Sequence, residues 1–405
     1  MKYRTWTKNK NSAGQEMVAA CCRLLTLGLL VAGFAATASA GPREQAKRIH
    51  DRLAGVPPSE LVLQQMEAEV DQFQAGSAID AAYRAMDNPN FYNITLKNFA
   101  APWTNRAGDV FVPLNDYVAT VVGMIRDDVP FNTLLSADII YVGANNLGLP
   151  AYSNNNNDHY ATLEANGLDM MTGLERRVQS NVTGLPQQAT AGVVTTRAAA
   201  EAFFVAGTNR AMFRFTMVNH LCNDMEQVHD TNLIPDRIRK DVSRSPGGDS
   251  RLFLNSCIGC HTGMDPLAGA YAYYNFNETS GNIEYTPGVV QSKYFNNEAN
   301  FPGGYQTTDD SWINYWREGQ NRYLGWDPTR PGNGNGARTM GEELGNSDAF
   351  AACQVKKVFM AVCLRPPEDA TDRGQVDQMI ASFTAGGSYS MKQTFAEAAV
   401  YCMGQ

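Results

Sequence analysis

The stretch Cys257-Ile258-Gly259-Cys260-His261 decides what the rest of the chain has to fold around. Two thiols three residues apart, followed at once by an imidazole, have the spacing at which a c-type haem is attached covalently. On the first turn of a helix each thiol can add to one haem vinyl group, while the imidazole reaches the iron from the same side. The pentapeptide, called the CXXCH segment below, therefore predicts one covalent haem c. Cys257 and Cys260 would be its attachment residues, and His261 the proximal axial ligand of the iron.

Two other interpretations of close cysteines are a buried dithiol and half of a zinc site. A zinc site needs two further ligands at short spacing, and the nearest other cysteines are Cys222 and Cys353. The sequence holds no second CXXCH segment and no internal repeat, so we expect a single haem. It also lacks a nucleophile elbow, a zinc-protease helix, a dinucleotide fingerprint and a phosphate loop.

Residues 1–40 have the composition of a secretory signal peptide. Basic residues precede an apolar run from Leu24 to Ala35, and Ala38-Ser39-Ala40 supplies the small residues of a cleavage site. We expect cleavage after Ala40. Nothing later in the chain approaches about 18 consecutive apolar residues, so we expect no transmembrane span in the mature protein. Because haem is attached covalently outside the bacterial cytoplasm, both features predict an exported protein of the periplasm or cell surface.

The mature chain carries a negative net charge. Removing the five basic residues and one acidic residue of the first 40 from totals of 33 and 41 leaves 28 against 40, a formal charge of −12. Such a surface does not favour nucleic acid as a partner. Haem propionates would add negative charge, so we expect a redox partner protein that presents a basic patch. The oligomeric state does not follow from the sequence.

Four cysteines remain after the leader and the haem pair are subtracted: Cys222, Cys353, Cys363 and Cys402. An even number in an oxidising compartment predicts two disulfides. Cys353 and Cys363 lie ten positions apart in one expected helix, about 15 Å at 1.5 Å per residue, so they should not bond each other. Cys402 is then a possible partner for either. The alternative is that all four are small buried free thiols.

The fold class that we expect is mainly α: a multi-helix body with a cytochrome c-like haem segment, long ordered loops and one small hairpin near Ile283 to Val290. Helical periodicity runs from Arg43 to about Ser136, with a break near Pro89, and returns from Thr196 to Leu221. The Gly- and Asn-rich segment 267–336 favours loops. Helices close the chain at Ser347–Leu364, Arg373–Ala385 and Met391–Met403.

The predicted domains are a signal peptide (1–40), an N-terminal helical domain (41–195) and a haem c-binding domain with the C-terminal helices (196–405). The mature chain is much longer than a minimal cytochrome of about a hundred residues, so something besides haem binding fills it. We expect the haem pocket to be built on the C-terminal half and covered by the N-terminal helices.

The sixth iron ligand decides between electron transfer and catalysis. Met340 lies downstream of the motif ahead of a helix, and His159 follows a polar loop; these are the two main candidates. His220 and His229 flank the acidic turn before the motif, and an open sixth position is the remaining alternative. The candidate partners of the haem propionates are four cations: Arg210, Arg214, Arg251 and Lys293. Aromatic residues between Tyr271 and Trp326 are candidates for the pocket wall.

The segment from Cys257 to Leu267, with its Asp265-Pro266 step and the following Tyr274-Asn275-Phe276, resembles the haem segment of the planctomycete-type cytochrome c domain proteins. Residues 52–58 and 350–359 look more weakly like the N-terminal and C-terminal helical domains of those exported mono-haem proteins. They are often much longer than this chain, and their biochemical role is poorly defined. The resemblance therefore implies haem c and export, and it implies no substrate.

The sequence leads us to expect an exported c-type cytochrome whose main activity is electron transfer. One alternative is a haem c oxidoreductase, peroxidase-like, in which the iron keeps an open site and residues 267–336 shape a substrate pocket. The other is a haem-bearing structural subunit of a surface complex. Whether the protein is an enzyme depends on the coordination of the iron.

Overall fold

Helices make up most of the structure, a computed structural model that describes residues 40–71 and 75–404. The predicted mainly α class is therefore confirmed. The predicted signal peptide lies outside the described residues, apart from Ala40. Within the two described ranges, no helix is both long enough and apolar enough to span a membrane.

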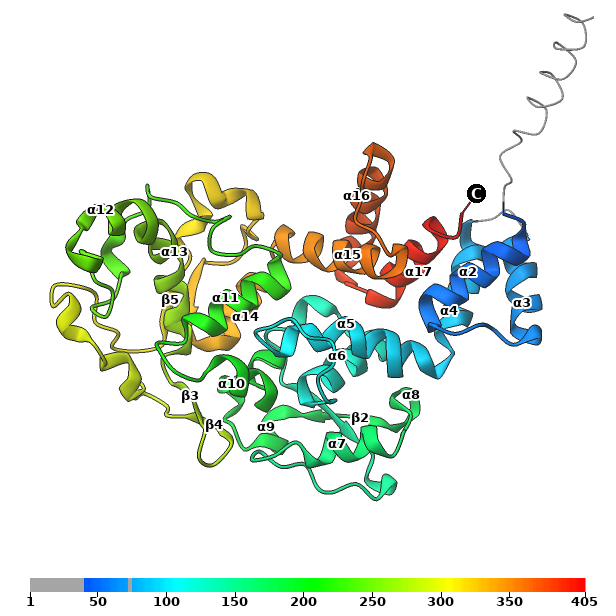
Figure 1. The fold of residues 1–405 in the computed structure, drawn as a ribbon, viewed down its shortest axis with the longest axis horizontal. Coiled ribbons are helices and arrows are strands. Elements are labelled where there is room, and N and C mark those ends of the chain that lie inside the picture. The colour runs from blue at the N-terminus through cyan, green and yellow to red at the C-terminus, as the bar shows by residue number, and fades with distance from the viewer. Residues whose placement is uncertain (1–39, 72–74, 405) are drawn as a thin grey trace, which may run out of the picture. The chain divides into compact units, whose positions relative to one another are not determined.

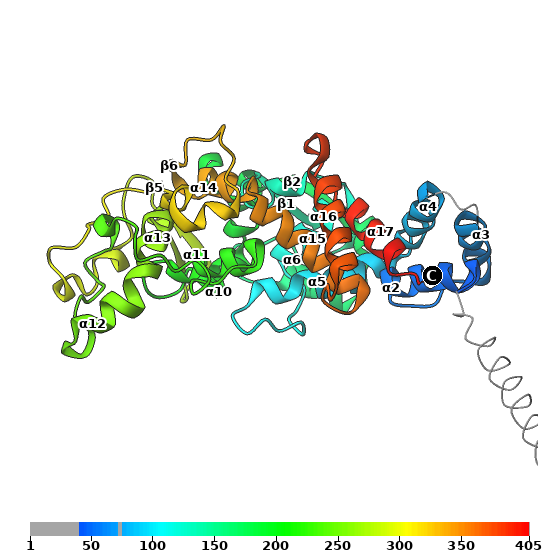
Figure 2. The same cartoon turned by 90° about the horizontal axis from the view of Figure 1, so that it is seen from above.

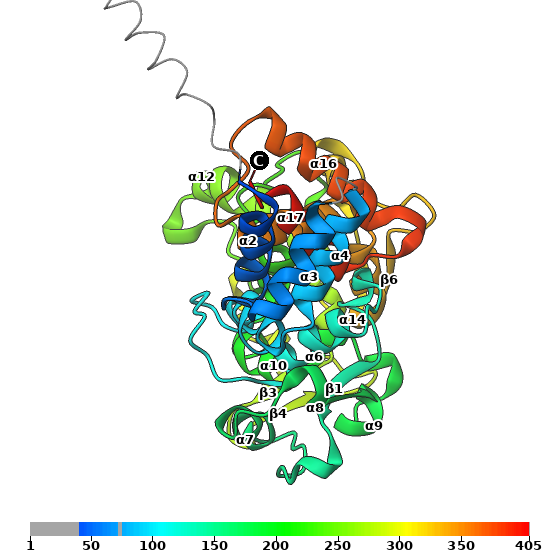
Figure 3. The same cartoon turned by 90° about the vertical axis from the view of Figure 1, so that its right-hand side faces the viewer.

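Three N-terminal helices pack against one another. Helix α2 (Pro42–Ala54) contacts both α3 (Glu60–Asp71) and α4 (Ala75–Met86). Residues spaced three or four apart form the buried face of α2, as expected for an amphipathic helix: Ala46, Ile49, His50 and Leu53. The last helix, α17 (Met391–Tyr401), packs on α2 and α4 and lies beside them in Figures 1 and 3. Elements from opposite ends of the sequence thus share one core.

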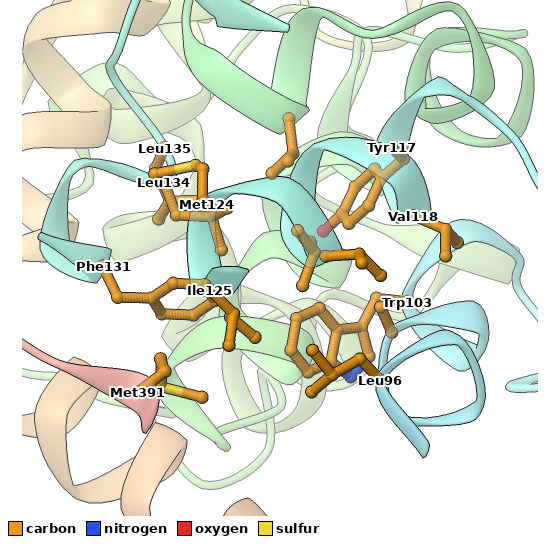
Figure 4. Packing of buried hydrophobic residues seen from close by; sticks show 14 of the residues in the cluster. Leu96, Trp103, Tyr117, Val118, Met124, Ile125, Phe131, Leu134, Leu135 and Met391 are labelled. Carbon is orange, nitrogen blue, oxygen red and sulfur yellow. The ribbon is translucent and has the colours of Figure 1, made fainter. Parts of the chain in front are cut away.

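Helix α6 (Asp116–Arg126) is the central element of the first half. The Asn115 side chain caps it by accepting the Val118 N–H, and every residue from Asp116 to Ile125 is buried. Strand β1 (Ile139–Gly143) packs on α6 and forms an antiparallel pair with β2 (Leu174–Val178). Figure 4 shows side chains of α6 packed with residues from the following loop and from α17: Met124, Ile125, Phe131, Leu134, Leu135 and Met391.

The other helices of the first half are short, and their positions agree with the sequence pattern. The predicted break near Pro89 is confirmed, because α4 ends at Met86 and a π-helical turn, η1, begins at Phe91. The polar stretch before residue 158 is largely loop. The elements are η1 (Phe91–Leu96), α5 (Lys97–Ala100), α7 (Asp158–Ala165), α8 (Met170–Gly173) and α9 (Gln179–Thr183).

The second half begins with the predicted helical block. Thr196 caps α10 (Arg197–Phe203) by accepting the Ala199 N–H, and α11 (Arg210–Thr216) runs on into the π-helical η7 (Met217–Leu221). The predicted C-terminal helices are confirmed to within three residues at each end. They are α15 (Asp348–Cys363), α16 (Ala370–Thr384) and α17. A further helix that was not predicted, α14 (Gly336–Gly345), precedes them.

Among the residues that the structure describes there are three small antiparallel strand pairs, whereas the sequence predicted one hairpin. Strand β3 (Tyr274–Asn277) pairs with β4 (Asn282–Tyr285), so the hairpin begins earlier than predicted, and only its second strand overlaps the predicted range 283–290. A second pair, β5 (Ser311–Ile313) with β6 (Asn333–Asn335), lies within the predicted loops, and β1–β2 was not predicted. Strands of three to five residues are too short to show a clear two-residue alternation.

Both predicted disulfides are present. Cys222 is bonded to Cys353, and Cys363 to Cys402, with Cα atoms 5.3 and 5.5 Å apart. Cys353 and Cys363 do not bond each other, as the length of α15 predicts. Helix α15 therefore carries one half of each disulfide, and it ties η7 at one end to α17 at the other.

The CXXCH segment lies in the second half of the chain. It spans the end of the π-helical η10 (Phe253–Cys257) and the start of α13 (Ile258–Ala268), just after the short α12 (Ser250–Leu252). In Figures 1 and 2, α12 and α13 lie far from α2–α4. The expectation that the N-terminal helices cover this segment is therefore wrong for α2–α4; α2 and α4 pack on C-terminal helices instead, and α3 packs on α2 and α4. The domain boundary after residue 195 stays a prediction.

Candidate functional site

The two thiols and the imidazole of the CXXCH segment share one face of a helix. Cys257 ends η10, and Cys260 and His261 lie in the first turn of α13, at spacings that an α-helix brings to one side. Both thiols are half-buried, and neither is bonded to another cysteine in the described part of the chain. The side chain of His261 is 19% exposed. The structure thus brings the predicted attachment residues and the predicted proximal ligand together.

The Cys260 thiol is not set up as a reactive nucleophile. Its Sγ atom lies 3.5 Å from the carbonyl oxygen of Met225. Burial and the nearby Glu226 carboxylate raise the pKa of Cys260. Catalytic thiols of dithiol oxidoreductases have a lowered pKa instead, because the thiolate is the attacking species. This environment therefore disfavours a redox dithiol and leaves a neutral thiol.

Two glycines allow aromatic rings to lie against the opposite face of α13. A Cβ atom on Gly259 would lie 2.5 Å from the ring of His229, and one on Gly263 would overlap the indole of Trp316. Thr262, on the same face, donates its hydroxyl to the carbonyl of Asp230 over 2.9 Å. The helix is thus held from behind, while the face with the thiols is left partly exposed.

The imidazole of His261 is hydrogen-bonded to a buried carboxylate. Its Nδ1 atom lies 3.2 Å from Oδ2 of Asp265, one turn further along α13, and Arg210 donates to the two oxygens of Asp265 over 2.6 and 3.0 Å. Burial alone would raise the pKa of Asp265, but Arg210 and His261 outweigh it and hold that pKa well below its usual range. An ionised carboxylate accepts a hydrogen bond, so Nδ1 carries the proton. Nε2 is therefore the ring nitrogen that can bind a metal.

The hydrogen bond between Asp265 and His261 was not predicted from the sequence, where Asp265 was noted only as part of the Asp-Pro step of a family resemblance. The signal that could have found it is local, since Asp265 follows His261 by four residues on a helix and therefore lies on the same side. Its second partner, Arg210, has no such signal, because it comes from α11, 55 residues earlier in the chain.

The second candidate for the sixth ligand, His159, is engaged elsewhere. Its Nε2 accepts the backbone N–H of Gly143 at 2.8 Å, and its Nδ1 lies 2.6 Å from the carbonyl oxygen of Pro150. It is buried in α7 rather than carried by the preceding loop. With both ring nitrogens used, His159 holds the loop after β1 and has none left for a metal.

The other candidates lie in contrasting surroundings. Met340 is fully buried in α14, a helix that packs on η11 (Gly269–Tyr271), the turn that continues α13. His220 is also buried, and its Nε2 lies 2.7 Å from the hydroxyl of Tyr117. His229 packs behind α13, away from the thiols. No described hydrogen bond holds the side chain of Met340 elsewhere, and the same is true of the His229 ring, which instead packs on Gly259.

The four cations proposed for the propionates all have other partners. Arg210 is shared between Asp265 and Asp241. Arg214 and Arg251 pair with Asp224 and Asp249. Lys293 donates to the carbonyl of Phe204 over 2.6 Å, and burial lowers its pKa to about 8. The predicted aromatic wall is likewise mostly core, with Tyr271, Tyr274 and Trp316 fully buried.

A cavity of about 460 Å³ lies near the back of α13, between β5, η14 (Tyr315–Arg317) and the loop that begins at Asp230. Its apolar lining includes Leu233, Ile234 and Pro331. In the described part of the chain, no three His, Cys, Asp or Glu side chains are grouped so that they could hold a metal ion by themselves. No family model, curated protein or solved structure matches this chain. Its function is therefore inferred from the side chains described above.

Proposed function

We propose that the protein carries one covalent haem c on Cys257 and Cys260, with His261 as proximal ligand, and that it transfers electrons in the periplasm or at the cell surface. The observation that carries the proposal is the environment of the CXXCH segment: two unpaired, half-buried thiols beside an imidazole whose Nδ1 is bound to Asp265. We also propose that the protein is related to the planctomycete-type cytochrome c domain proteins, which its haem segment resembles.

The residues present fit a covalent haem in their chemistry. Each thiol would add across one vinyl group, forming a carbon–sulfur bond while its hydrogen goes to the other vinyl carbon. A neutral thiol such as Cys260 is the form that such an addition consumes. Leu252 and Leu254, in the turns just before Cys257, are 50% and 54% exposed and offer apolar surface to a porphyrin. When bound, haem supplies a one-electron iron couple.

Electron transfer is supported by the partial exposure of the attachment residues. A cofactor held on half-buried thiols has one edge near the surface, where a partner protein can approach. The formal charge of −12 on residues 41–405 favours a partner with a basic patch. Met340 remains the proposed sixth ligand in this scheme.

A haem c oxidoreductase with an open iron site is the second candidate function. It is favoured by the engagement of His159 and His220 in other hydrogen bonds and by the full burial of Met340. If none of the three reaches the iron, the sixth position is free for a small molecule. The cavity near Asp230 is then a candidate substrate site.

Expression with the haem-attachment machinery tests the proposal. Wild-type protein and the exposed-site control Ser256→Ala should keep haem stain on a denaturing gel, whereas Cys257→Ala with Cys260→Ala should lose it. Absence of stain in the wild type would contradict the proposal. Ferric and ferrous spectra with and without carbon monoxide then separate the two candidates. A low-spin form that excludes the gas supports electron transfer, and rapid gas binding supports the oxidoreductase.

A further inference from the structure

A chain of hydrogen-bonded charges leads from His261 through the buried Asp265 to Arg210 and Asp241. Behind Asp265, the guanidinium of Arg210 also donates to both oxygens of Asp241, over 2.6 and 2.9 Å. The backbone N–H of Arg239 lies 3.3 Å from Oδ2 of Asp265, and its guanidinium donates to the carbonyls of Thr208 and Asp265. The side chain of Asp265 is fully buried, and that of Asp241 is 14% exposed. Asp265 is therefore a fixed, water-excluded acceptor for the imidazole.

We propose that Asp265 is a positioning residue for His261, and that it makes the imidazole a stronger electron donor and so lowers the reduction potential of the iron. This inference rests on the proposed function, because it concerns the proposed iron ligand.

The physical reason is the negative charge of the acceptor. A carboxylate that accepts the Nδ1 proton of a ligand imidazole fixes the ring orientation and raises the basicity of Nε2. A more basic ligand stabilises ferric iron relative to ferrous iron, since the oxidised metal has the higher charge. A neutral acceptor such as a backbone carbonyl would have a weaker effect. Outer hydrogen bonds of this kind are one of the means by which a protein sets a haem potential.

Arg210 limits the same effect. Its cation draws electron density from the Asp265 carboxylate and so weakens the carboxylate's pull on the imidazole proton. Asp241 holds Arg210 from the other side and divides its charge between two anions. Substitutions of Asp265 and of Arg210 should therefore shift the reduction potential in opposite directions. Removing the Asp265 charge should raise the potential, and removing Arg210 should lower it.

The test compares Asp265→Asn with a matched control. Asp249→Asn also removes one negative charge near the CXXCH segment, but Asp249 pairs with Arg251 and does not touch His261. In spectroelectrochemical titrations we expect Asp265→Asn to favour reduction at least tenfold, which is about 59 mV for one electron. The control should change the equilibrium less than threefold. Asp265→Glu, which keeps the charge, should recover part of the wild-type value.

A second variant guards against misfolding of Asp265→Asn. The double variant Arg210→Gln with Asp241→Asn keeps Asp265 and removes its cation together with the outer anion, and it should shift the potential in the opposite direction. Shifts of the same sign in both variants, or an Asp265→Asn potential equal to that of Asp249→Asn, would overturn the inference. Wild-type protein without covalent haem would instead overturn the proposed function, and this inference with it.

Discussion

Gly259 and His229 lie in direct contact: a Cβ atom on Gly259 would stand 2.5 Å from Cε1 and Nε2 of the His229 ring. Gly259 is the second variable position of the CXXCH segment. At about 100° per residue it lies about 160° around the helix from Cys257 and about 100° from Cys260. His229 thus supports the helix from the side opposite Cys257. The motif leaves this position open, but the tertiary structure requires a residue without a side chain.

Replacement of Gly259 by alanine should destabilise the protein. At an open helical position, glycine to alanine gains about 1 kcal/mol, so a net loss of about 1–3 kcal/mol would report the clash with His229. Gly374 in α16 is the control, since nothing lies within 4 Å of its added Cβ, and Gly374→Ala should stabilise. Urea unfolding measures both. Adding His229→Ala to Gly259→Ala should restore part of the lost stability, because it removes the ring that the new Cβ meets. A Gly259→Ala protein as stable as wild type would contradict the contact.

Loss of the Cys222–Cys353 disulfide should cost more stability than loss of Cys363–Cys402. The first links residues 131 positions apart and the second 39 positions. Chain entropy gives upper values of about 5 and 4 kcal/mol for loops of these lengths. Paired serine substitutions, compared by urea unfolding, should show this order. Peptide mapping of the unreduced wild type checks the pairing itself, and a Cys353–Cys402 peptide would contradict it.

Lys357 should make the stability pH-dependent. Its Nζ lies 4.1 Å from the ring centre of Trp103 and donates to the carbonyl of Asn219, and burial lowers its pKa to about 7, from 10.5. Between these values the unfolded chain holds a proton that the folded protein lacks. The free energy of unfolding therefore rises with pH across this window, by at most about 1.4 kcal/mol per pH unit.

The substitution Lys357→Met should remove this dependence, and the variant should gain stability over wild type as the pH falls from 10.5 toward 7. Its neighbour Lys356 is exposed on the same helix, so Lys356→Met should keep the wild-type slope. Urea unfolding at several pH values distinguishes the two. Equal slopes in wild type and Lys357→Met would show that the lysine keeps its proton when buried.

His159→Ala should lower stability without altering the haem spectrum. Both ring nitrogens hold backbone groups, and leaving them unpaired costs about 1–3 kcal/mol each when they are buried. Thermal unfolding and absorption spectra of the haem-loaded protein measure the two effects. A changed spectrum would return His159 to the list of iron ligands.

Met340→Leu should remove the near-infrared methionine band of the electron carrier. Leucine has a similar volume and no sulfur, so the core should lose less than about 1.5 kcal/mol while the ligand is lost. An unchanged spectrum would exclude Met340 and move the proposal to the oxidoreductase with an open site. Met379, fully buried in α16, provides a control methionine whose replacement by leucine should leave the spectrum as it is.

The helices could be predicted largely from the sequence, because their signals are local. Ser347 and Ser390 begin α15 and α17 by accepting N–H groups three residues ahead, and the apolar spacing of α2 is visible without a structure. The strand pairs were misplaced or missed, since each strand has only three to five residues and its partner is set by tertiary contacts. The N-terminal helices pack on the C-terminal ones, a long-range choice that periodicity does not encode.

The sequence alone determined the composition of the candidate site: two thiols and an imidazole at a spacing that one helical turn places on one face. That information is local, because backbone geometry over five residues is enough to interpret it. Only the tertiary structure decided which cysteines pair, which ring nitrogen of His261 is free and why His159 is engaged. Each of these depends on a partner brought close by folding, as with Arg210 and Asp265, 55 residues apart. Such contacts follow from how the packed helices meet.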